Sequence, residues 1–376
     1  MTRPVAKGWC PGAYRPMMSG DGLVVRVRPI MARVTADQAL GLCNLSVKFG
    51  SGLIDLTSRA NLQIRGVREE DHEALLQELN ALDLLPDDPA LEARRNILIA
   101  PDWRDGDVTK RLAKELYARL AELPELPAKF GFAVDTGDAP AFHENSADIR
   151  IERSGKNIVV RADGCAKGRA VAEAETISAA IEMAHWFAET GGATSRRMAQ
   201  HVKTTPLPAD WQTASTVLDG SMPEVGQTEL GTYYGAPFGQ IESTQLSELV
   251  KTSGCRALRV TPWRLFMTED AAPVKSTAFV TDPDDPLLNV DACPGAPLCT
   301  SSTVETREIA KKLAASTNAR LHVSGCSKGC ARPRKSEMTL VGHDGRFDLV
   351  KNGLPWDEPS LTGLSPKDLL DRIGEF

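Results

Sequence analysis

The spacing of hydrophobic positions changes along the chain between helical and strand periods, which predicts a mixed α/β protein. Residues 69–82 and 108–122 each place leucines on one stripe, as an amphipathic helix does. In residues 23–28, Arg26 and Arg28 instead alternate with valines, so a strand would project both arginines from one side. The leucines of the two helical stripes are Leu75, Leu76 and Leu79, and Leu112, Leu116 and Leu120.

A weak internal repeat organises these elements. Residues 34–64 recur as residues 241–267, roughly 205 positions later. Each copy predicts a helix after a Ser/Thr-rich cap, a turn at glycine and a β-branched strand. The strands end in Thr-x-Arg (57–59) and Thr-Pro-Trp-Arg (261–264). Chance similarity at this level is an alternative, so the repeat is a hypothesis.

A second pair of segments supports the repeat. Residues 148–164 and 337–353 both predict hairpins, which turn at Ser-Gly and Asp-Gly dipeptides. Each hairpin precedes a predicted helix, over residues 170–188 in the first copy and after Ser365-Pro366 in the second.

Composition is ordinary for a globular protein, with 42% hydrophobic and 25% charged residues among 376. The net charge of −6 argues against broad nucleic-acid binding, although it allows a local basic pocket. The N-terminal stretch lacks the apolar core of a signal peptide, and no run reaches the roughly 18 apolar residues of a membrane helix. We therefore expect a cytoplasmic protein with reduced thiols.

Half of the eight cysteines fall within 38 residues, in the pattern C-x5-C, a long gap and C-x3-C. Four thiolates at one point suit an iron–sulfur cluster or a zinc ion. Glycines beside the cysteines favour the cluster, since backbone can then pass close to an inorganic core. The alternatives are zinc and a set of unrelated buried thiols. The cysteines are Cys293, Cys299, Cys326 and Cys330, and the glycines are Gly295, Gly325 and Gly329.

Between the two cysteine pairs, Ser302 and Glu305 have the spacing of a capping box and predict a helix that continues to about residue 315. Residues 321–323 then predict a short strand that delivers the second pair on the turn beyond it.

Basic residues gather at strand ends and loops. Any single arginine is most often a solvated surface charge, but Arg26 and Arg28 share a strand that is otherwise Val and Leu. A pocket lined by such residues would bind carboxylates through charge-assisted hydrogen bonds. The other candidates are Arg59, Gln63 and Arg65 in one stretch, Arg94 and Arg95 in another, and Lys129.

Over nearly its whole length the chain resembles the sirohaem-dependent sulfite and nitrite reductase superfamily, and within it the precorrin-3B synthase family of aerobic cobalamin biosynthesis. The cysteine pattern and the repeat are the specific part of this resemblance. Three stretches carry the likeness to the superfamily, namely LTSRANLQIRG (56–66), RNILIA (95–100) and LPAKF (126–130). WCPGAYRPMMSGDGLVVRVRP (9–29) resembles the synthase branch. The L-P element of the reductases usually has the form L-P-R-K-F-K, whereas this chain has Ala128 and Gly131 at the flanking basic positions. That departure weakens the reductase interpretation.

The resemblance implies an α/β (α+β) fold with a duplicated sulfite/nitrite reductase-like architecture, in which two small ferredoxin-like half repeats pair and two larger α/β domains flank them. The implied segments are 1–85 for the first small repeat, 86–200 for the first α/β domain, 201–230 for a linker, 231–285 for the second small repeat and 286–376 for the 4Fe-4S domain.

The resemblance also implies an oxidoreductase, a tetrapyrrole monooxygenase that converts precorrin-3A to precorrin-3B by O2-dependent hydroxylation at C20 with lactone formation. The four cysteines would hold a [4Fe-4S] cluster, with Cys330 facing the active centre. Electrons would come from an external donor, for which an NADH-linked reductase is one candidate. The residues expected to grip the carboxylate rim of the tetrapyrrole are Arg26, Arg59, Gln63, Arg95 and Lys129.

Catalytic residues stay unassigned. A second iron centre, either sirohaem or a mononuclear non-haem iron, is left open, and His143, His322 and His343 have no metal-binding spacing. The alternatives to the synthase are a sirohaem-dependent sulfite or nitrite reductase and a zinc-stapled binding module without redox chemistry.

Overall fold

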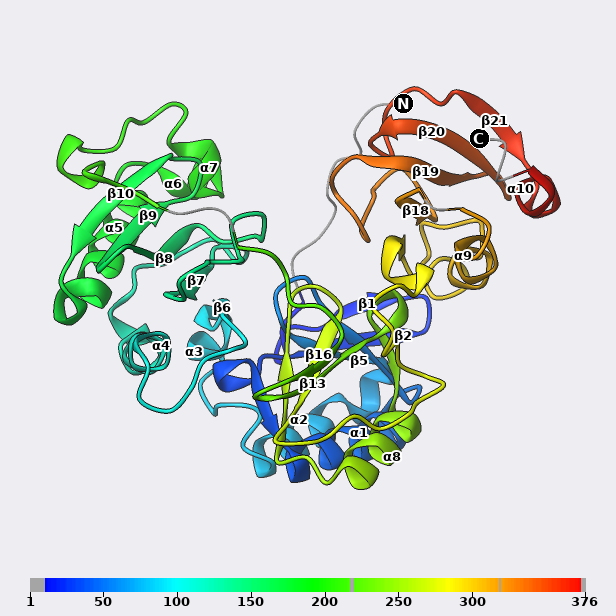
Figure 1. Ribbon diagram of the computed structural model, residues 1–376, viewed down its shortest axis with the longest axis horizontal. Helices are drawn as coiled ribbons and strands as arrows, with labels where there is room; N and C mark the ends of the chain where they lie inside the picture. The colour runs from blue at the N-terminus through cyan, green and yellow to red at the C-terminus, as the bar shows by residue number, and fades with distance from the viewer. Residues whose placement is uncertain (1–10, 217–219, 318, 373–376) are drawn as a thin grey trace.

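The computed structural model describes residues 11–216, 220–317 and 319–372. Two small sheets with their helices form a central body, and two larger α/β units stand on either side of it (Figure 1). The left unit in that view carries β6–β10, and the right unit carries β17–β21. A mixed α/β architecture in duplicate is thus confirmed.

The first small sheet has the strand order β1-β2-β5-β4-β14, and the second has the order β12-β13-β16-β15-β3. The strands of the first are β1 (Met17–Ser19), β2 (Gly22–Val27), β5 (Leu62–Val67), β4 (Leu53–Leu56) and β14 (Gln240–Glu242). Those of the second are β12 (Gly226–Thr228), β13 (Gly231–Gly235), β16 (Leu265–Glu269), β15 (Ala257–Val260) and β3 (Arg33–Thr35).

The two repeats exchange a strand. β3 precedes the helix of the first repeat, α1 (Ala36–Phe49), yet it pairs with β15 of the second. β14 precedes the helix of the second repeat, α8 (Ser243–Ser253), and pairs with β4 of the first. The same order of elements in both copies confirms the predicted repeat, and the exchange explains why neither sheet is complete alone.

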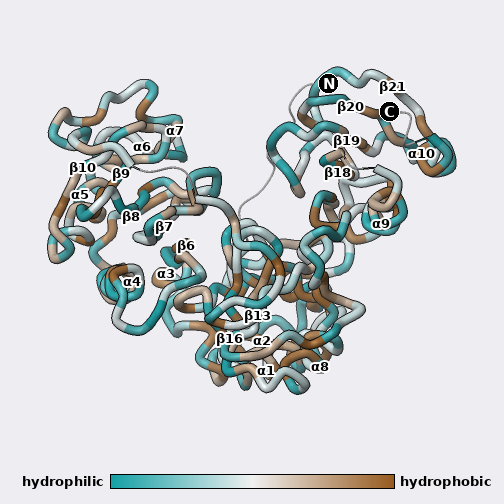
Figure 2. The backbone as a smooth tube through the Cα atoms, in the orientation of Figure 1, coloured by the Kyte–Doolittle hydropathy of each residue, from teal (hydrophilic) through white to brown (hydrophobic). Residues whose placement is uncertain are grey.

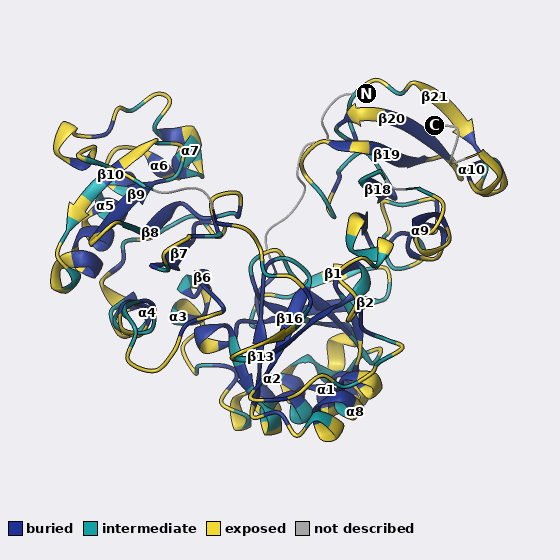
Figure 3. Cartoon of the chain, viewed as in Figure 1, coloured by how far each residue is buried: buried dark blue, intermediate teal, exposed yellow. Residues whose placement is uncertain are grey.

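One hydrophobic core joins the repeats. Ile54 and Ile64 of the first sheet and Phe266 of the second belong to the same cluster, together with Leu42 of α1 and Leu246 of α8. Each such buried side chain contributes about 1.5–3 kcal/mol by leaving water. Hydrophobic segments gather around these strands and helices (Figure 2), and the strands are buried while the outer sides of α1 and α8 are exposed (Figure 3). The opposite face of the first small sheet carries the polar residues Arg26, Asp55 and Gln63, which are partners across β2, β5 and β4.

The two larger units also share a plan. In the first, β6, β7 and β8 are parallel, and β8, β9, β10 and β11 continue antiparallel; in the second, β17, β18 and β19 are parallel, and β20 and β21 follow antiparallel. The predicted hairpins are therefore confirmed as β8–β9 and β19–β20. The strands of the first unit are β6 (Ile97–Ile99), β7 (Phe132–Asp135), β8 (Ile149–Ser154), β9 (Asn157–Ala162), β10 (Lys167–Val171) and β11 (Ala214–Ser215). Those of the second are β17 (Val290–Ala292), β18 (Leu321–Ser324), β19 (Ser336–His343), β20 (Arg346–Gly353) and β21 (Leu361–Leu364).

Helices cover these sheets close to where the periodicity places them. The predicted helices at 69–82 and 108–122 are α2 and α4, each extended by a 3-10 turn. Besides α1 and α8, the α-helices of the described residues are α2 (His72–Ala81), α3 (Pro89–Arg94), α4 (Val108–Ala118), α5 (Thr176–Glu189), α6 (Gly192–Ser195), α7 (Met198–His201), α9 (Arg307–Ala314) and α10 (Pro366–Arg372).

Two predicted helix starts are wrong. The helix expected from residue 170 begins at Thr176, because residues 169–171 pair with β9 as part of strand β10. The helix expected after Ser302 begins at Arg307, because the Ser302 hydroxyl accepts a hydrogen bond from Val304 N and closes a local turn.

The segment 201–230, expected as a linker, contributes β11 to the first larger sheet and β12 to the second small sheet. The residue-level domain boundaries stay predictions. Across the parts of the chain that the structure describes, no helix is long and apolar enough to span a membrane.

Candidate functional site

Two equivalent turns lie at the ends of the small sheets. Thr57 Oγ1 accepts hydrogen bonds from Arg59 N (3.3 Å) and Asn61 N (3.1 Å), and Thr261 Oγ1 accepts one from Trp263 N (3.3 Å). The turns close with left-handed residues at matching positions, Ala60 (φ 51°) and Arg264 (φ 64°). Arg59 and Trp263 therefore occupy corresponding places in the two repeats.

Both turns hold the same loop, which connects β7 to β8. Arg59 Nη2 donates to Ser146 Oγ (3.1 Å), and Trp263 stacks on Phe142 with ring centroids 5.3 Å apart. Glu144, between these contacts, forms an ion pair with Arg334, which follows the second cysteine pair. The loop thus lies between the Arg59 turn and the cysteine-bearing unit.

Arg264 connects the second turn to the cysteines directly. Its Nη2 donates to the carbonyl of Ala331 (2.8 Å), the residue after Cys330, and its Nη1 pairs with Asp291 (2.5 Å). Asp291 also binds Arg320 and Arg332, so it anchors three arginines. The sequence pattern places Arg264 only at the end of the repeat, because its role depends on a contact 67 residues away.

Arg26 and Gln63 are brought together by strand register on the polar face of the first small sheet. They are direct partners across β2 and β5. With its amide oriented to satisfy both groups, the Gln63 oxygen accepts hydrogen bonds from Arg26 Nη2 (3.0 Å) and Nε (3.3 Å). Asp55 is the partner of Gln63 on the next strand.

Arg95 lies apart from that pair, in an enclosed position. Its guanidinium donates to the carbonyl of Arg28 (2.6 Å), and burial lowers its pKa from the usual value. Arg28 in turn forms a buried ion pair with Glu92 and donates to Asn96 Oδ1 (3.2 Å).

Asn96 fixes the loop that carries Lys129. Its Nδ2 donates to the carbonyls of Ala128 (3.1 Å) and Phe130 (3.2 Å), on either side of the exposed Lys129. The RNILIA stretch contained Asn96, but its spacing gave no sign of this role. A buried carboxylate, Asp148, completes the support by accepting a hydrogen bond from Gly131 N (3.0 Å).

The four cysteines share one neighbourhood. Cys293 Sγ accepts a hydrogen bond from Gly325 N (3.1 Å), which joins the two cysteine loops. Lys328 Nζ donates to Ser301 Oγ (2.7 Å) across the same junction. Although Cys330 is open to solvent on one side, burial by the surrounding protein and the nearness of the other three thiols raise its pKa to about 11. Burial also raises the pKa of Cys293.

Among the described residues, no group of three or more His, Cys, Asp or Glu side chains is arranged to hold one metal ion. Around one zinc ion, four sulfurs at 2.3 Å would lie about 3.8 Å from each other. The backbone N–H of Gly325, which is aimed at Cys293 Sγ, makes the kind of hydrogen bond that a metal-bound thiolate accepts.

The cysteine-flanking glycines allow close protein packing. A Cβ at Gly295 would lie 2.5 Å from Thr306 Oγ1, and one at Gly325 would lie 2.2 Å from Ser302 Oγ. A Cβ at Gly329 would lie 2.7 Å from Pro355 Cγ. Their tight neighbours are thus protein atoms, so the loops are held compactly by their own contacts.

The histidines add no evident ligand. His143 and His343 are exposed, whereas His322 is fully buried on β18, where neither ring nitrogen has a hydrogen-bond partner among the described residues. Burial lowers the pKa of His322 to about 4, so its ring is neutral near pH 7.

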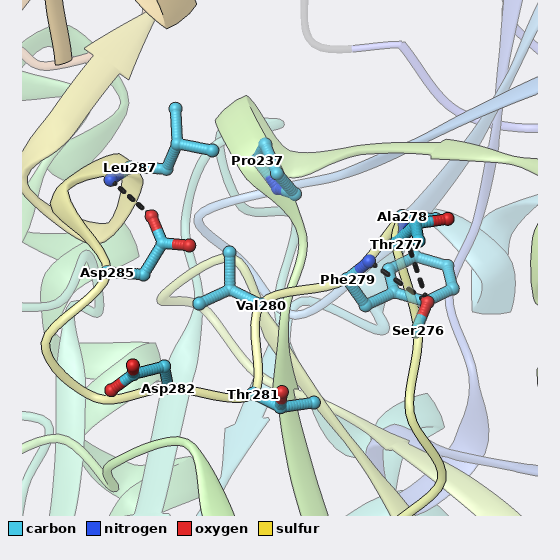
Figure 4. Close-up of a pocket in the computed structure, with 10 residues that line it drawn as sticks. All are labelled: Pro237, Ser276, Thr277, Ala278, Phe279, Val280, Thr281, Asp282, Asp285 and Leu287. Atoms are coloured by element: carbon cyan, nitrogen blue, oxygen red, sulfur yellow. Dashed lines mark hydrogen bonds between the residues drawn. The ribbon is translucent and has the colours of Figure 1, made fainter. Parts of the chain in front are cut away.

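A separate shallow pocket lies beside residues 276–287 of the second repeat (Figure 4). Its charged lining residues are Asp282 and Asp285, and it contains none of the predicted site residues. The Asp285 and Ser276 side chains accept hydrogen bonds from nearby backbone N–H groups. An acidic lining does not suit a polycarboxylate ligand.

Several known proteins are similar to this chain in sequence or in fold. Residues 15–82 match the nitrite/sulfite reductase ferredoxin-like half domain. A precorrin-3B synthase from Sinorhizobium sp. is 28% identical over 94% of this chain and 84% of its own length. A ferredoxin–nitrite reductase from Synechococcus elongatus is 24% identical over 98% of this chain and 88% of its own length.

The solved structure of the Mycobacterium tuberculosis NirA protein superimposes with a TM-score of 0.61 at 16% identity, covering 94% of this chain and 79% of that one, which establishes a common fold. The prediction of an oxidoreductase agrees with the reductases and the synthase among the relatives. Over nearly its whole length the chain is thus similar in sequence to a precorrin-3B synthase and to a nitrite reductase, and it shares its fold with the NirA protein.

Proposed function

We propose that this chain is a precorrin-3B synthase, an oxidoreductase that hydroxylates precorrin-3A at C20 with O2 and allows a ring carboxylate to close a lactone. One observation carries the proposal: both small-sheet turns are connected to the loop that bears Cys326 and Cys330. Arg264 of the second turn donates to the carbonyl of Ala331, and Arg59 of the first turn holds the β7–β8 loop, which forms an ion pair with Arg334. A cluster and a carboxylate-binding cation would therefore serve one site.

Cys293, Cys299, Cys326 and Cys330 would hold a [4Fe-4S] cluster. Such a cluster passes single electrons from an external donor to the reacting centre. The Gly325 N–H already points at Cys293 Sγ, and it would stabilise the thiolate that iron requires. Because burial raises the pKa values of Cys293 and Cys330, iron binding must displace protons from these thiols.

Arg26, Arg59, Gln63, Arg95 and Lys129 are proposed to bind the tetrapyrrole, with different roles. Arg59 and Lys129 would meet carboxylates directly, since one reaches a loop at the site and the other is exposed. Gln63 orients Arg26 through the two hydrogen bonds to its guanidinium. Arg95 is enclosed, so it would act by holding the Arg28 backbone.

A reductase is the second candidate, because the nitrite reductase relative spans nearly the whole chain. Gly131 argues against it. A Cβ there would lie 2.8 Å from the Asn96 carbonyl oxygen and 3.4 Å from Arg59 Nη1. The basic side chain that the reductase pattern places at this position would collide with backbone and bring a second cation against Arg59.

Gly131→Lys is therefore expected to lower activity on precorrin-3A by at least about tenfold. A displacement of a substrate-binding loop by roughly 1 Å is enough to lower the rate by that much or more. Steady-state turnover measures the effect. Gly137→Lys, in a loop where a Cβ would meet its nearest neighbour, Asp135 Oδ1, at 3.5 Å, is the control for an added charge. Equal activities of both variants and the wild type would contradict the role given to Gly131.

The proposed function is tested by anaerobic purification, quantitation of iron, acid-labile sulfide and tetrapyrrole, and addition of precorrin-3A with and without O2. We expect iron and sulfide in cluster proportions and an O2-dependent product that gains one oxygen atom. Sirohaem absorption bands with sulfite or nitrite reduction would establish the reductase instead. One zinc ion without sulfide would leave a binding module. Candidate donors, including an NADH-linked reductase, can be compared in the same assay.

A further inference from the structure

Three donors of the first small repeat converge on one carbonyl of the loop between β17 and α9, which carries Cys293 and Cys299 and is called the cysteine loop below. Leu298, directly before Cys299, accepts hydrogen bonds from Ser19 Oγ (2.7 Å), Gly20 N (3.1 Å) and Arg65 Nη2 (3.4 Å). Ser19 and Gly20 belong to the β1–β2 hairpin, and Arg65 lies on the polar face of β5. The hairpin and β5 therefore clamp the loop from one side.

Arg65 is itself held rigidly. It is 4% exposed, and its guanidinium contacts Asp21 through Nη2 (2.7 Å) and Nε (3.0 Å) and Asp55 through Nη1 (3.0 Å). A planar guanidinium bound on two sides has little freedom to reorient. The other oxygen of Asp55 accepts from Arg307 Nη2 (3.3 Å), at the start of α9. The same network thus fixes the cysteine loop in its middle and at its end.

The second repeat contains an equivalent clamp with the signs of charge exchanged. Asp55 pairs with Arg65, which lies two residues beyond its strand partner Gln63. Arg259 pairs with Glu269, which lies two residues beyond its strand partner Met267.

Arg259 also grips a loop of the neighbouring larger unit. Its Nη1 donates to the carbonyls of Pro101 (2.7 Å) and Trp103 (2.6 Å). That loop follows β6 as the cysteine loop follows β17, and its sequence between β6 and α4 contains no cysteine. The fold therefore supplies one clamp on a cysteine loop and one matched clamp on a loop without thiols.

We propose that Arg65 is a positioning residue for the iron–sulfur cluster, which sets the place of Cys299 by holding the Leu298 carbonyl. The inference rests on the proposed function only in taking Cys299 as a cluster ligand. Removing Arg65 would free the loop and leave the carbonyl of Leu298 with fewer donors. The consequence is a cluster that is held less tightly and has an altered electronic structure.

The test compares Arg65→Gln with Arg259→Gln. Each variant removes one buried guanidinium with its ion pairs, to Asp21 and Asp55 for Arg65 and to Glu269 for Arg259, and with its carbonyl contacts. General destabilisation of the apo protein should therefore be comparable. After anaerobic reconstitution with iron and sulfide, we expect Arg65→Gln to lose its cluster to an iron chelator about 10- to 100-fold faster than wild type. Its reduced cluster should also give a shifted electron paramagnetic resonance spectrum. Arg259→Gln should match the wild type in both measurements.

Gly20→Ala probes the clamp without disturbing buried charge. Gly20 is exposed, and a Cβ there would lie 2.3 Å from the Pro297 carbonyl oxygen, so the methyl group would push the cysteine loop away. We expect the same direction of change in chelator resistance and spectrum. This variant decides the matter if Arg65→Gln does not fold.

The apo protein separates this inference from the proposed function. Cys299 in apo Arg65→Gln and apo Gly20→Ala should be alkylated faster than in the wild type, whether or not any cluster assembles. A wild type that binds no iron would end the cluster assignment, while faster alkylation would still support the clamp. Wild-type alkylation and cluster-loss rates in both variants would overturn it.

Discussion

Replacing Cys326 by serine should abolish cluster assembly and activity on precorrin-3A together. Cys326 lies two residues beyond the end of β18, and its carbonyl accepts a hydrogen bond from Ser324 Oγ (2.7 Å), so the side chain starts from a fixed backbone. A serine oxygen is a harder ligand than a thiolate and ionises far less readily, and three remaining thiols hold a cube poorly. We expect the brown absorption and most of the iron and sulfide to be lost.

Cys165 provides a matched control, because residues 164–168 share the pattern Gly-Cys-x-Lys-Gly with residues 325–329, which contain Cys326. Cys165 lies in the other larger unit, in the segment between β9 and β10. Burial raises its pKa, as burial raises that of Cys293. Cys165→Ser should keep the full cluster content and activity. A brown, active Cys326→Ser variant, or a colourless Cys165→Ser variant, would show that the ligands have been assigned wrongly.

The sequence predicted the parts of this fold that depend on local patterns. The second hairpin followed from alternation and the Asp344-Gly345 turn, and the first from alternation, although it turns at Gly155-Lys156, one residue later than the predicted Ser154-Gly155. The repeat followed from recurring helix–strand order. The exchange of β3 and β14 between repeats was not predictable, since edge pairing depends on how the two copies meet. The helix start expected at Ser302 failed because the hydroxyl closed its own turn instead.

The candidate site, like the fold, was predictable only where a local sequence pattern determines it. Four cysteines were found by spacing alone, and the structure brings them into one neighbourhood. Arg26 with Gln63 depended on strand register, which the sequence did not fix. Asn96, Arg264 and Arg65 act through carbonyls far away in sequence, and no residue pattern announces such a contact.

Arg59→Ala should weaken binding of the tetrapyrrole by about 1.5–3 kcal/mol, the contribution of a hydrogen bond to a charged group. Since about 1.4 kcal/mol corresponds to tenfold, the dissociation constant should rise roughly 10- to 150-fold. Fluorescence quenching or calorimetry with precorrin-3A under anaerobic conditions measures binding without turnover. The cluster content should stay unchanged, because Arg59 contacts the loop at Ser146 and not the cysteines.

Two controls separate the charge of Arg59 from its structural contact. Ser146→Ala removes the hydroxyl that accepts from Arg59 Nη2 but keeps the guanidinium, so it should weaken binding much less. Arg68→Ala removes an exposed arginine that pairs with Asp71, and it should leave binding unaffected. If Arg59→Ala and Ser146→Ala weaken binding equally, Arg59 acts by holding the loop; if Arg59→Ala binds like the wild type, Arg59 lies outside the site. A loss specific to Arg59→Ala would mean that the Arg59 cation itself meets a carboxylate. Ser146→Ala keeps that cation, Arg68→Ala removes a charge elsewhere, and in all three variants the loop keeps its stacking contact between Phe142 and Trp263.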